Sequence, residues 1–171
     1  MDITPFLSQM AQHAETVRNL CLCVSDEQAR WKPDPKSWSM LEVINHLDDE
    51  EREDFRARLN FLLHHPEQPW PSTDPAGWVI ERQYNQREFD TSLQNFLNAR
   101  QESLAWLKAL EAPRWQNEYF HAPAGRRLSA GDMFTSWLAH DLLHMRQLVE
   151  LKWAYTSRIM KPFSVDYAGQ F

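Results

Sequence analysis

The sequence predicts an all-α fold made of four long helices. Only four of the 171 residues are glycine, against eight tryptophans and nine phenylalanines, which is poor material for tight β-turns. Long amphipathic runs are rich in Leu, Ala, Glu and Arg, which favour helices. Prolines cluster between these runs. The length suits one domain with its own core, so we expect residues 1–171 to form a single domain.

Net charge and hydropathy exclude several classes of protein. The formal charge is −6 and the pI is near 5.6, whereas a nucleic-acid binder needs clustered Lys and Arg to neutralise phosphates. No apolar run approaches the roughly 18 to 20 residues that span a bilayer, and the first ten residues do not resemble a signal peptide. We therefore expect a cytoplasmic protein that binds neither nucleic acid nor membrane.

The first helix is expected from Thr4, as N-cap, and Pro5 to about Val24. Its apolar stripe follows steps of three and four residues. The stripe comprises Phe6, Met10, Ala14, Val17, Cys21 and Val24. His13 lies beside it, at the edge of the core. Cys21 and Cys23 point about 200° apart on a helix, so we interpret them as packing residues and not as a disulfide or a metal site.

The second helix is expected to run from Met40 to about His64. Ser39 and Glu42 form a capping box at its start, after a proline-containing connector. The charged centre, "DDEEREDFRAR", is expected mostly to face solvent. The apolar side comprises Met40, Ile44, Leu47, Phe55 and Leu62. His46 falls on the flank of this side. Trp31 and Trp38 precede the helix and are interpreted as packing residues, with a role in a pocket wall as the alternative.

A long crossover is expected between the second and third helices. Residues 64–77 hold four of the ten prolines and cannot continue a helix. The third helix then covers Ile80–Glu111, and Pro113 ends it. Arg100 falls within its buried phase, where it either extends its charged end to the surface or pairs with an acid such as Glu50.

The fourth helix is expected to start after Ser129, its N-cap, with Asp132 three residues on. A polar link precedes it, in which Gly125 is the residue that accepts a positive φ. The helix carries a seam in steps of three and four residues. The seam comprises Met133, Trp137, His140, His144, Gln147 and Leu151.

His140 and His144 are four residues apart, so both imidazoles can reach one metal ion. The alternative is that both are hydrogen-bonded core residues, since leaving them without partners would cost about 1 to 3 kcal/mol each. His46 is the natural third ligand if the second and fourth helices are neighbours. Glu50 follows His46 by one turn and is a candidate fourth ligand or nearby base.

The segments "RWKPDPKSWSMLEVINHLDDEE" and "GRRLSAGDMFTSWLAHDLLHMRQL" resemble the DinB/YfiT-like superfamily of metalloenzymes. The resemblance covers nearly the whole chain and implies a four-helix bundle in up-down-down-up order, with the crossover between the second and third helices. It further implies a metal ion, zinc or nickel, held by His46, His140 and His144. Several members are transferases or isomerases that use low-molecular-weight bacterial thiols, others are called hydrolases, and members often form homodimers.

Three neutral nitrogen ligands with an open fourth position are typical of a catalytic zinc site, which activates a water or a thiol. The sequence thus predicts a metal-dependent transferase or hydrolase acting on a small molecule, and the resemblance adds a low-molecular-weight thiol as a candidate cosubstrate. The alternatives are a metal-binding bundle without turnover, used in sensing, storage or partner binding, and a bundle without metal.

Other residues have expected places around this site. Asp141 is a candidate contact to a ligand histidine, and Arg126 a candidate partner for a carboxylate of a thiol cofactor, with a solvated loop arginine as the alternative. A pocket lined by aromatic residues should lie beside the three histidines. Trp70 or Trp78, if exposed, would suit a dimer interface.

Overall fold

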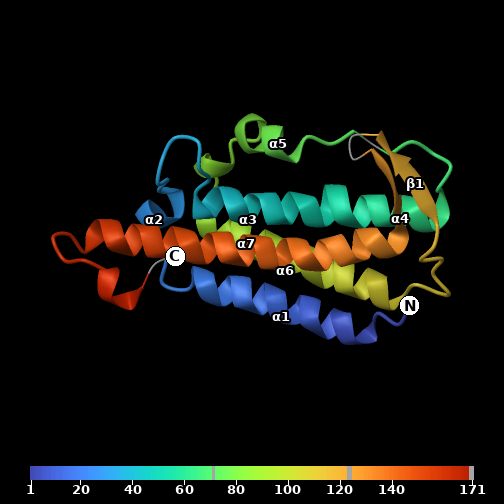
Figure 1. Ribbon diagram of the computed structural model, residues 1–171, viewed down its shortest axis with the longest axis horizontal. Coiled ribbons are helices and arrows are strands. Elements are labelled where there is room, and N and C mark those ends of the chain that lie inside the picture. Colours follow the sequence, from blue (N-terminus) through green and yellow to red (C-terminus); the bar gives the residue numbers. More distant parts are fainter. Residues whose placement is uncertain (71, 123–124, 170–171) are drawn as a thin grey trace.

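The computed structural model describes residues 1–70, 72–122 and 125–169, and its main body is a bundle of four long helical segments (Figure 1). The segments are α1 (Thr4–Cys21), α3 (Met40–Asp49) continued by the π-helix η1 (Glu50–Phe55) and α4 (Arg56–His64), α6 (Phe89–Lys108) and α7 (Ala130–Ile159). The shorter elements are α2 (Asp26–Arg30), α5 (Pro75–Glu81), η2 (Tyr84–Gln86), β1 (Glu118–His121), β2 (Arg126–Ser129) and η4 (Asp166–Ala168). None of the helices in the described ranges is long and apolar enough to cross a membrane.

Helices α1 and α3–α4 each pack against both α6 and α7. Helices α1 and α7 run in the same direction: His13 bonds Asp141, and further along both helices Lys152 donates to the carbonyl of Leu20. In Figure 1, α3–α4 and α6 run the opposite way, and the link through α5 carries the chain back along the bundle between them. This return is the long crossover that the prolines predicted.

Two capping boxes begin the helices that carry the histidines. Ser39 and Glu42 exchange side-chain-to-backbone hydrogen bonds of 2.7 and 3.1 Å at the start of α3, and Ser129 and Asp132 do the same at the start of α7. Both caps confirm the predicted starts. Helix α1 differs, because Ile3 is its N-cap without a side-chain bond and the helix ends at Cys21.

We expect Ser129→Ala to lower the free energy of unfolding by about 1 kcal/mol, because the first amides of α7 lose their side-chain acceptor. Urea denaturation measures this difference. Ser136→Ala, at an exposed position inside the same helix, is the matched control and should change stability by less than about 0.5 kcal/mol. Equal losses for the two variants would contradict the prediction.

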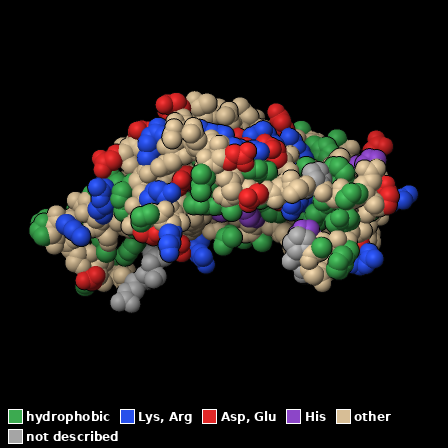
Figure 2. Space-filling view, turned by 90° about the horizontal axis from the view of Figure 1, so that it is seen from above, with side chains coloured by type: hydrophobic (Ala, Val, Ile, Leu, Met, Phe, Trp, Pro, Cys, Tyr) green, Lys and Arg blue, Asp and Glu red, His purple; other side chains and the backbone are tan. Residues whose placement is uncertain are grey.

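The charged centre of the second helical segment is buried, and the prediction that it faces solvent is wrong. Its buried acids are Asp48, Asp49, Glu50, Glu51 and Asp54. The sequence periodicity does not show that α5 and η2 lie over this face of α3. Arg82, at the end of α5, donates to Asp49 and Glu53 at 2.7 Å, and acidic and basic side chains lie together on this side in Figure 2. The crossover thus converts a charged helix face into an ion-pair layer.

The third helix begins later than predicted. Asp74 caps α5 by accepting a hydrogen bond from the amide of Gly77 at 3.0 Å. This short helix begins at Pro75, before Ile80, and ends at Glu81. A left-handed residue, Gln83, and η2 follow, and α6 begins only at Phe89. Ile80 is 83% exposed. The prediction of one continuous third helix from Ile80 is therefore wrong. The chain forms the short helix α5, then a turn with η2, and then α6.

A β-hairpin replaces the predicted polar link. Strands β1 and β2 pair antiparallel, with Glu118 opposite Ser129 and His121 opposite Arg126. Gly125 takes a φ of 63°, which confirms the expected positive value. Trp70 stacks on Tyr119, with ring centroids 4.9 Å apart. The all-α prediction is thus correct for the bundle but omits this hairpin. The low glycine content disfavours tight β-turns and does not predict it.

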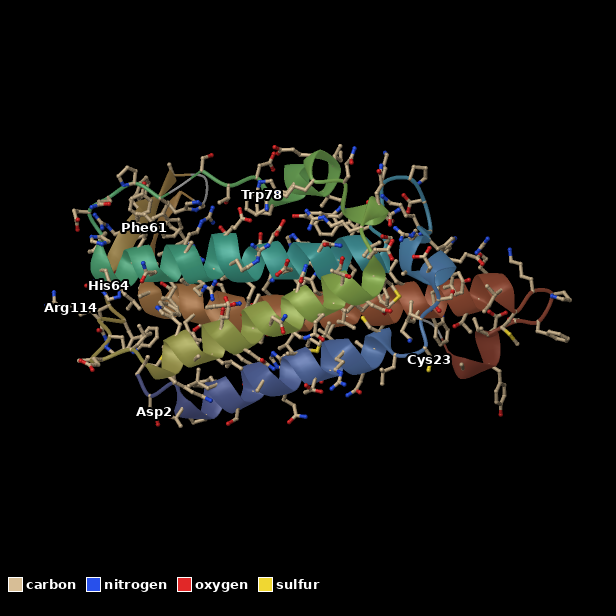
Figure 3. All side chains as sticks on the ribbon, turned by 180° about the vertical axis from the view of Figure 1, so that it is seen from behind. Asp2, Cys23, Phe61, His64, Trp78 and Arg114 are labelled. Carbon is tan, nitrogen blue, oxygen red and sulfur yellow. The ribbon has the colours of Figure 1, made fainter. Side chains whose placement is uncertain are left out.

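The core confirms most of the predicted apolar stripes, with one shift on α1. Met10, Val17 and Cys21 are buried, whereas Phe6 is 38% exposed and Leu7 takes its place in the core. Cys21 is buried in the core as predicted, whereas Cys23, labelled in Figure 3, is exposed beyond the end of α1, so its interpretation as a packing residue is wrong.

Candidate metal centre

The structure brings His46, His140 and His144 together. The cap at Ser39 starts α3 so that His46 faces α7, where the other two lie one turn apart. The Nε2 atoms of His140 and His144 are 3.0 Å apart, and those of His46 and His140 are 3.3 Å apart. Within the described ranges these three form the group of His, Cys, Asp and Glu side chains whose ligand atoms all lie within 4.8 Å of one another.

All three imidazoles are neutral at physiological pH. Burial lowers the pKa of His46 to about 2, helped by the two other histidines, and lowers that of His140 to about 3. Burial also lowers the pKa of His144. The Nδ1 atom of His46 is buried without a hydrogen-bond partner. The cluster thus offers lone pairs and no charge of its own.

The donor set fits a transition-metal ion. His144 Nδ1 lies 2.8 Å from the side-chain oxygen of Gln147, so Nδ1 donates and Nε2 carries the lone pair. A tetrahedral zinc ion with bonds of 2.0 to 2.1 Å needs nitrogens about 3.3 Å apart. Both measured Nε2 separations are near this value. Nε2 of His140 lies within hydrogen-bond distance of the other two, so without an ion a shared proton can link the rings; an ion at their centre would instead accept a lone pair from each ring.

Aromatic rings and a pocket surround the cluster. Trp38 contacts both His46, at a centroid distance of 4.9 Å, and His144, whose ring is nearly parallel to it. Phe55 contacts His140 at 4.9 Å. A pocket of about 500 Å³ reaches His144 and has Trp38 in its wall. A pocket is therefore present as expected, but it reaches His144 alone of the three histidines and its wall is not mainly aromatic. The pocket-wall alternative holds for Trp38, and Trp31 packs against Tyr155.

Asp141 does not contact the three histidines. Its carboxylate bonds His13 at 3.0 Å and receives two hydrogen bonds from Arg100, at 2.7 and 2.8 Å. Burial raises the pKa of Asp141, but these hydrogen bonds outweigh it and leave the pKa lowered. Asp141 points about 100° away from His140 around the helix, into the core. The predicted contact to a ligand histidine is therefore wrong, and Asp141 holds α1, α6 and α7 together.

Arg100 is fully buried and binds Glu51 as well as Asp141. Its Nε donates to Glu51 at 2.7 Å. Arg100 does not reach the surface, and the second predicted alternative, pairing with an acid, is confirmed, although the acids are Glu51 and Asp141 and not Glu50. Glu51 lies four residues after the buried Leu47, on the same helix face, whereas Glu50 lies four residues after His46.

Glu50 lies outside the group of converging metal-ligand atoms. It is 4% exposed, and its Oε1 atom has no hydrogen-bond partner. Burial raises the pKa of Glu50 to about 8, and the neighbouring Asp54 contributes to the rise. The raised pKa favours the protonated form of Glu50 in the metal-free protein, and the converging ligand group does not include it.

The remaining predicted residues lie away from the cluster. Arg126 is exposed on β2, as a solvated arginine, and makes no ion pair with the described residues. Trp78 is buried beneath Arg82, whose guanidinium lies 4.1 Å from its ring, and Figure 3 shows it on the crossover side. Trp70 is half-buried against the hairpin. Neither tryptophan supplies the exposed dimer surface that was expected, and the homodimer stays a prediction.

Sequence reasoning missed the roles of Gln147 and Phe55. Gln147 was recognised only as a seam residue, although its position three residues after His144 places it on the same helix face. Phe55 was assigned to the core. A search for polar side chains within one turn of each predicted ligand would have found Gln147.

Comparisons with known proteins agree with this architecture. The family model described as the DinB superfamily matches residues 9–148. A solved structure, described as "YfiT from Bacillus subtilis is a probable metal-dependent hydrolase with an unusual four-helix bundle topology", is similar with a TM-score of 0.78. The alignment covers 90% of this chain and 87% of that one, at 14% identity, which shows a shared fold. The comparison with curated proteins gave no match. With a family model matched over most of its length, the chain belongs to the DinB superfamily.

Proposed function

We propose that this protein is a metal-dependent enzyme that binds a divalent ion, zinc or nickel, through His46, His140 and His144. The observation that carries the proposal is the convergence of three neutral Nε2 atoms at 3.0 and 3.3 Å beside a pocket, with no carboxylate in the group. Such an all-nitrogen set with room for a further ligand is typical of catalytic metal sites, and structural sites are usually closed by four protein ligands.

When bound, the ion would act as a Lewis acid that lowers the pKa of a water or thiol ligand toward neutrality. The chain's own residues prepare the site for this. Gln147 fixes the tautomer and orientation of His144, while Trp38 and Phe55 hold the imidazole rings and exclude bulk water. The pocket next to His144 would hold a small molecule against the site.

Hydrolysis is the reaction we favour, because it needs only water as second substrate and because the structurally similar YfiT is described as a probable metal-dependent hydrolase. Transfer to, or isomerisation with, a low-molecular-weight thiol uses the same open position and is the second candidate. A metal-binding bundle without turnover would share the three histidines but would show neither activity.

We expect the parent protein to bind one equivalent of zinc or nickel and His144→Ala to lose at least nine-tenths of it. The substitution removes one of three ligands and leaves Nε2 of His140 without its neighbour. Element analysis after gel filtration measures the content. His65→Ala is the control, because His65 is an exposed histidine outside the cluster and its loss should leave the metal content unchanged.

Absence of metal from a folded parent, even after incubation with both ions, would contradict the proposal. The metal-loaded parent is then assayed against a panel of esters, amides and electrophiles, with and without low-molecular-weight thiols. Turnover without thiol supports a hydrolase, turnover only with thiol supports a transferase, and metal binding without turnover supports the non-catalytic alternative.

A further inference from the structure

Two buried side-chain atoms without hydrogen-bond partners lie one turn apart at the end of α3. They are Nδ1 of His46 and Oε1 of Glu50. The turn between them is regular α-helix, because the backbone N–H of Glu50 donates to the carbonyl of His46. The two residues are only 6% and 4% exposed. A buried polar atom without a partner costs about 1 to 3 kcal/mol, so two of them on successive turns indicate an interaction that forms in another state of the site.

The two atoms become complementary when the cluster holds an ion. His46 directs its Nε2 at that of His140, 3.3 Å away, so Nε2 is the atom that would give its lone pair to an ion, and the ring proton would then sit on Nδ1. An Nδ1–H group needs an acceptor. His144 has one, because its Nδ1 lies 2.8 Å from the side-chain oxygen of Gln147. Within the described ranges, Nδ1 of His46 has none.

Glu50 is suited to supply this acceptor. A helical side chain leans over the turn that precedes its own Cα, and for Glu50 that turn carries His46. The carboxyl group of Glu50 hydrogen-bonds to Asp54, and since Oε1 has no partner, this bond uses the other oxygen. Asp54 is in turn paired with Arg58 at 2.6 Å and accepts from Thr73 at 3.2 Å. The carboxyl group is thus held through one oxygen and can accept through the other.

The other buried side-chain atoms without partners in the described part of the chain do not lie within one turn of His46. They belong to Arg58, Trp70, Ser103 and His121. Nε of Arg58 and Nε1 of Trp70 are also donors and could not accept from an imidazole N–H. Oε1 of Glu50 is therefore the unpartnered buried acceptor on the turn next to His46.

We propose that Glu50 is a positioning residue of the metal centre, whose Oε1 accepts a hydrogen bond from Nδ1–H of His46, directly or through one water, when the ion is bound. The inference rests on the proposed function, because it requires an ion at Nε2 of His46. Such a bond fixes the orientation of the ring and makes its ligand nitrogen more basic, which strengthens metal binding. Glu50 would do for His46 what Gln147 does for His144.

The first test compares the zinc affinities of two variants by competition with a chromophoric chelator. Glu50→Met removes the acceptor, whereas Glu50→Gln keeps a side-chain carbonyl oxygen. Loss of the outer partner of a ligand histidine weakens metal binding about 10- to 100-fold, so we expect at least about a tenfold loss for Glu50→Met and at most about threefold for Glu50→Gln. Glu53→Met is the matched control, because it removes a carboxylate from the same π-helix and should change the affinity less than about twofold.

The second test is the imidazole NMR spectrum of the zinc-loaded protein, which a purely structural role of Glu50 would not alter. The Nδ1–H signal of His46, assigned through the contact of its ring with Trp38, should be visible and slow to exchange in the parent. Its chemical shift should change in Glu50→Gln, because the acceptor changes, and should stay the same in Glu53→Gln.

Equal zinc affinity of Glu50→Met and Glu53→Met, or a His46 signal that Glu50→Gln does not move, would overturn the inference and leave the proposed metal site intact. A parent that binds neither zinc nor nickel would overturn the proposed function and the inference with it. If Glu50→Met does not fold, the NMR comparison decides, because glutamine has nearly the same shape as glutamate.

Discussion

Replacing Arg100 by Met is expected to lower the free energy of unfolding by about 3 to 5 kcal/mol. Arg100, Glu51 and Asp141 are 1%, 1% and 2% exposed. Arg100 donates two hydrogen bonds to each carboxylate and a further one, of 3.2 Å, to the carbonyl of Met10. Methionine leaves both carboxylates buried without their cation, so each must be desolvated unpaired or take up a proton. Chemical denaturation followed by circular dichroism measures the loss.

Arg56→Met is the control for this substitution. Arg56 also bridges the second helical segment and α6, through Glu102 at 3.4 Å, but Glu102 is exposed. An exposed pair contributes less than about 1 kcal/mol, so the control should be nearly neutral. A loss for Arg100→Met as small as that for Arg56→Met would show that water or another cation replaces the guanidinium.

Replacing Glu50 by Gln is expected to stabilise the protein at pH 8, by roughly 3 to 4 kcal/mol relative to its effect at pH 5. The pKa of Glu50 is raised from 4.5 to about 8 in the folded protein. Between these values the folded chain keeps a proton that the unfolded chain releases. The parent therefore has the full contribution of Glu50 below pH 4.5 and loses it as the pH rises to 8. Glutamine resembles the protonated acid and has no proton to lose.

The measurement is urea denaturation of metal-free parent and variant at pH 5, 6, 7 and 8, so that the histidines titrate alike in both proteins. Glu53→Gln is the control from the same π-helix. The hydrogen bond from Arg82 lowers the pKa of Glu53. The stability difference between Glu53→Gln and the parent should therefore be the same at all four pH values. If the stability difference between Glu50→Gln and the parent did not change with pH, Glu50 would be ionised in the folded protein.

Much of the bundle could be predicted from local signals. The capping boxes at Ser39 and Ser129, the prolines of residues 64–77 and the steps of three and four along α7 each act over one or two turns. Such signals are visible in a sequence because the interacting residues are close along the chain. The same reasoning failed at Ile80 and at the hairpin, where turn chemistry and cross-strand pairing decide the structure.

The candidate metal site was predicted in its ligands but not in its surroundings. His140 and His144 share a helix face by spacing alone, and His46 follows if the second and fourth helices are neighbours, as the resemblance to the DinB superfamily also implies. The sequence could not assign the partners of the buried acids, because the partners lie far apart along the chain. Arg100 is 49 residues from Glu51 and 41 residues from Asp141. Arg100 binds Glu51 and not Glu50, the acid named from the sequence.

The sequence by itself determined the second and fourth helical segments with their caps, the crossover and the three candidate histidines, since these depend on periodicity and short-range hydrogen bonds. The tertiary structure alone decided that the acidic stretch is buried, that Asp141 binds Arg100 and not a ligand histidine, and that Trp38 lines a pocket. These outcomes depend on which helix faces lie against each other, and burial sets whether a carboxylate is solvated, paired or protonated. A pattern along one chain does not contain that information.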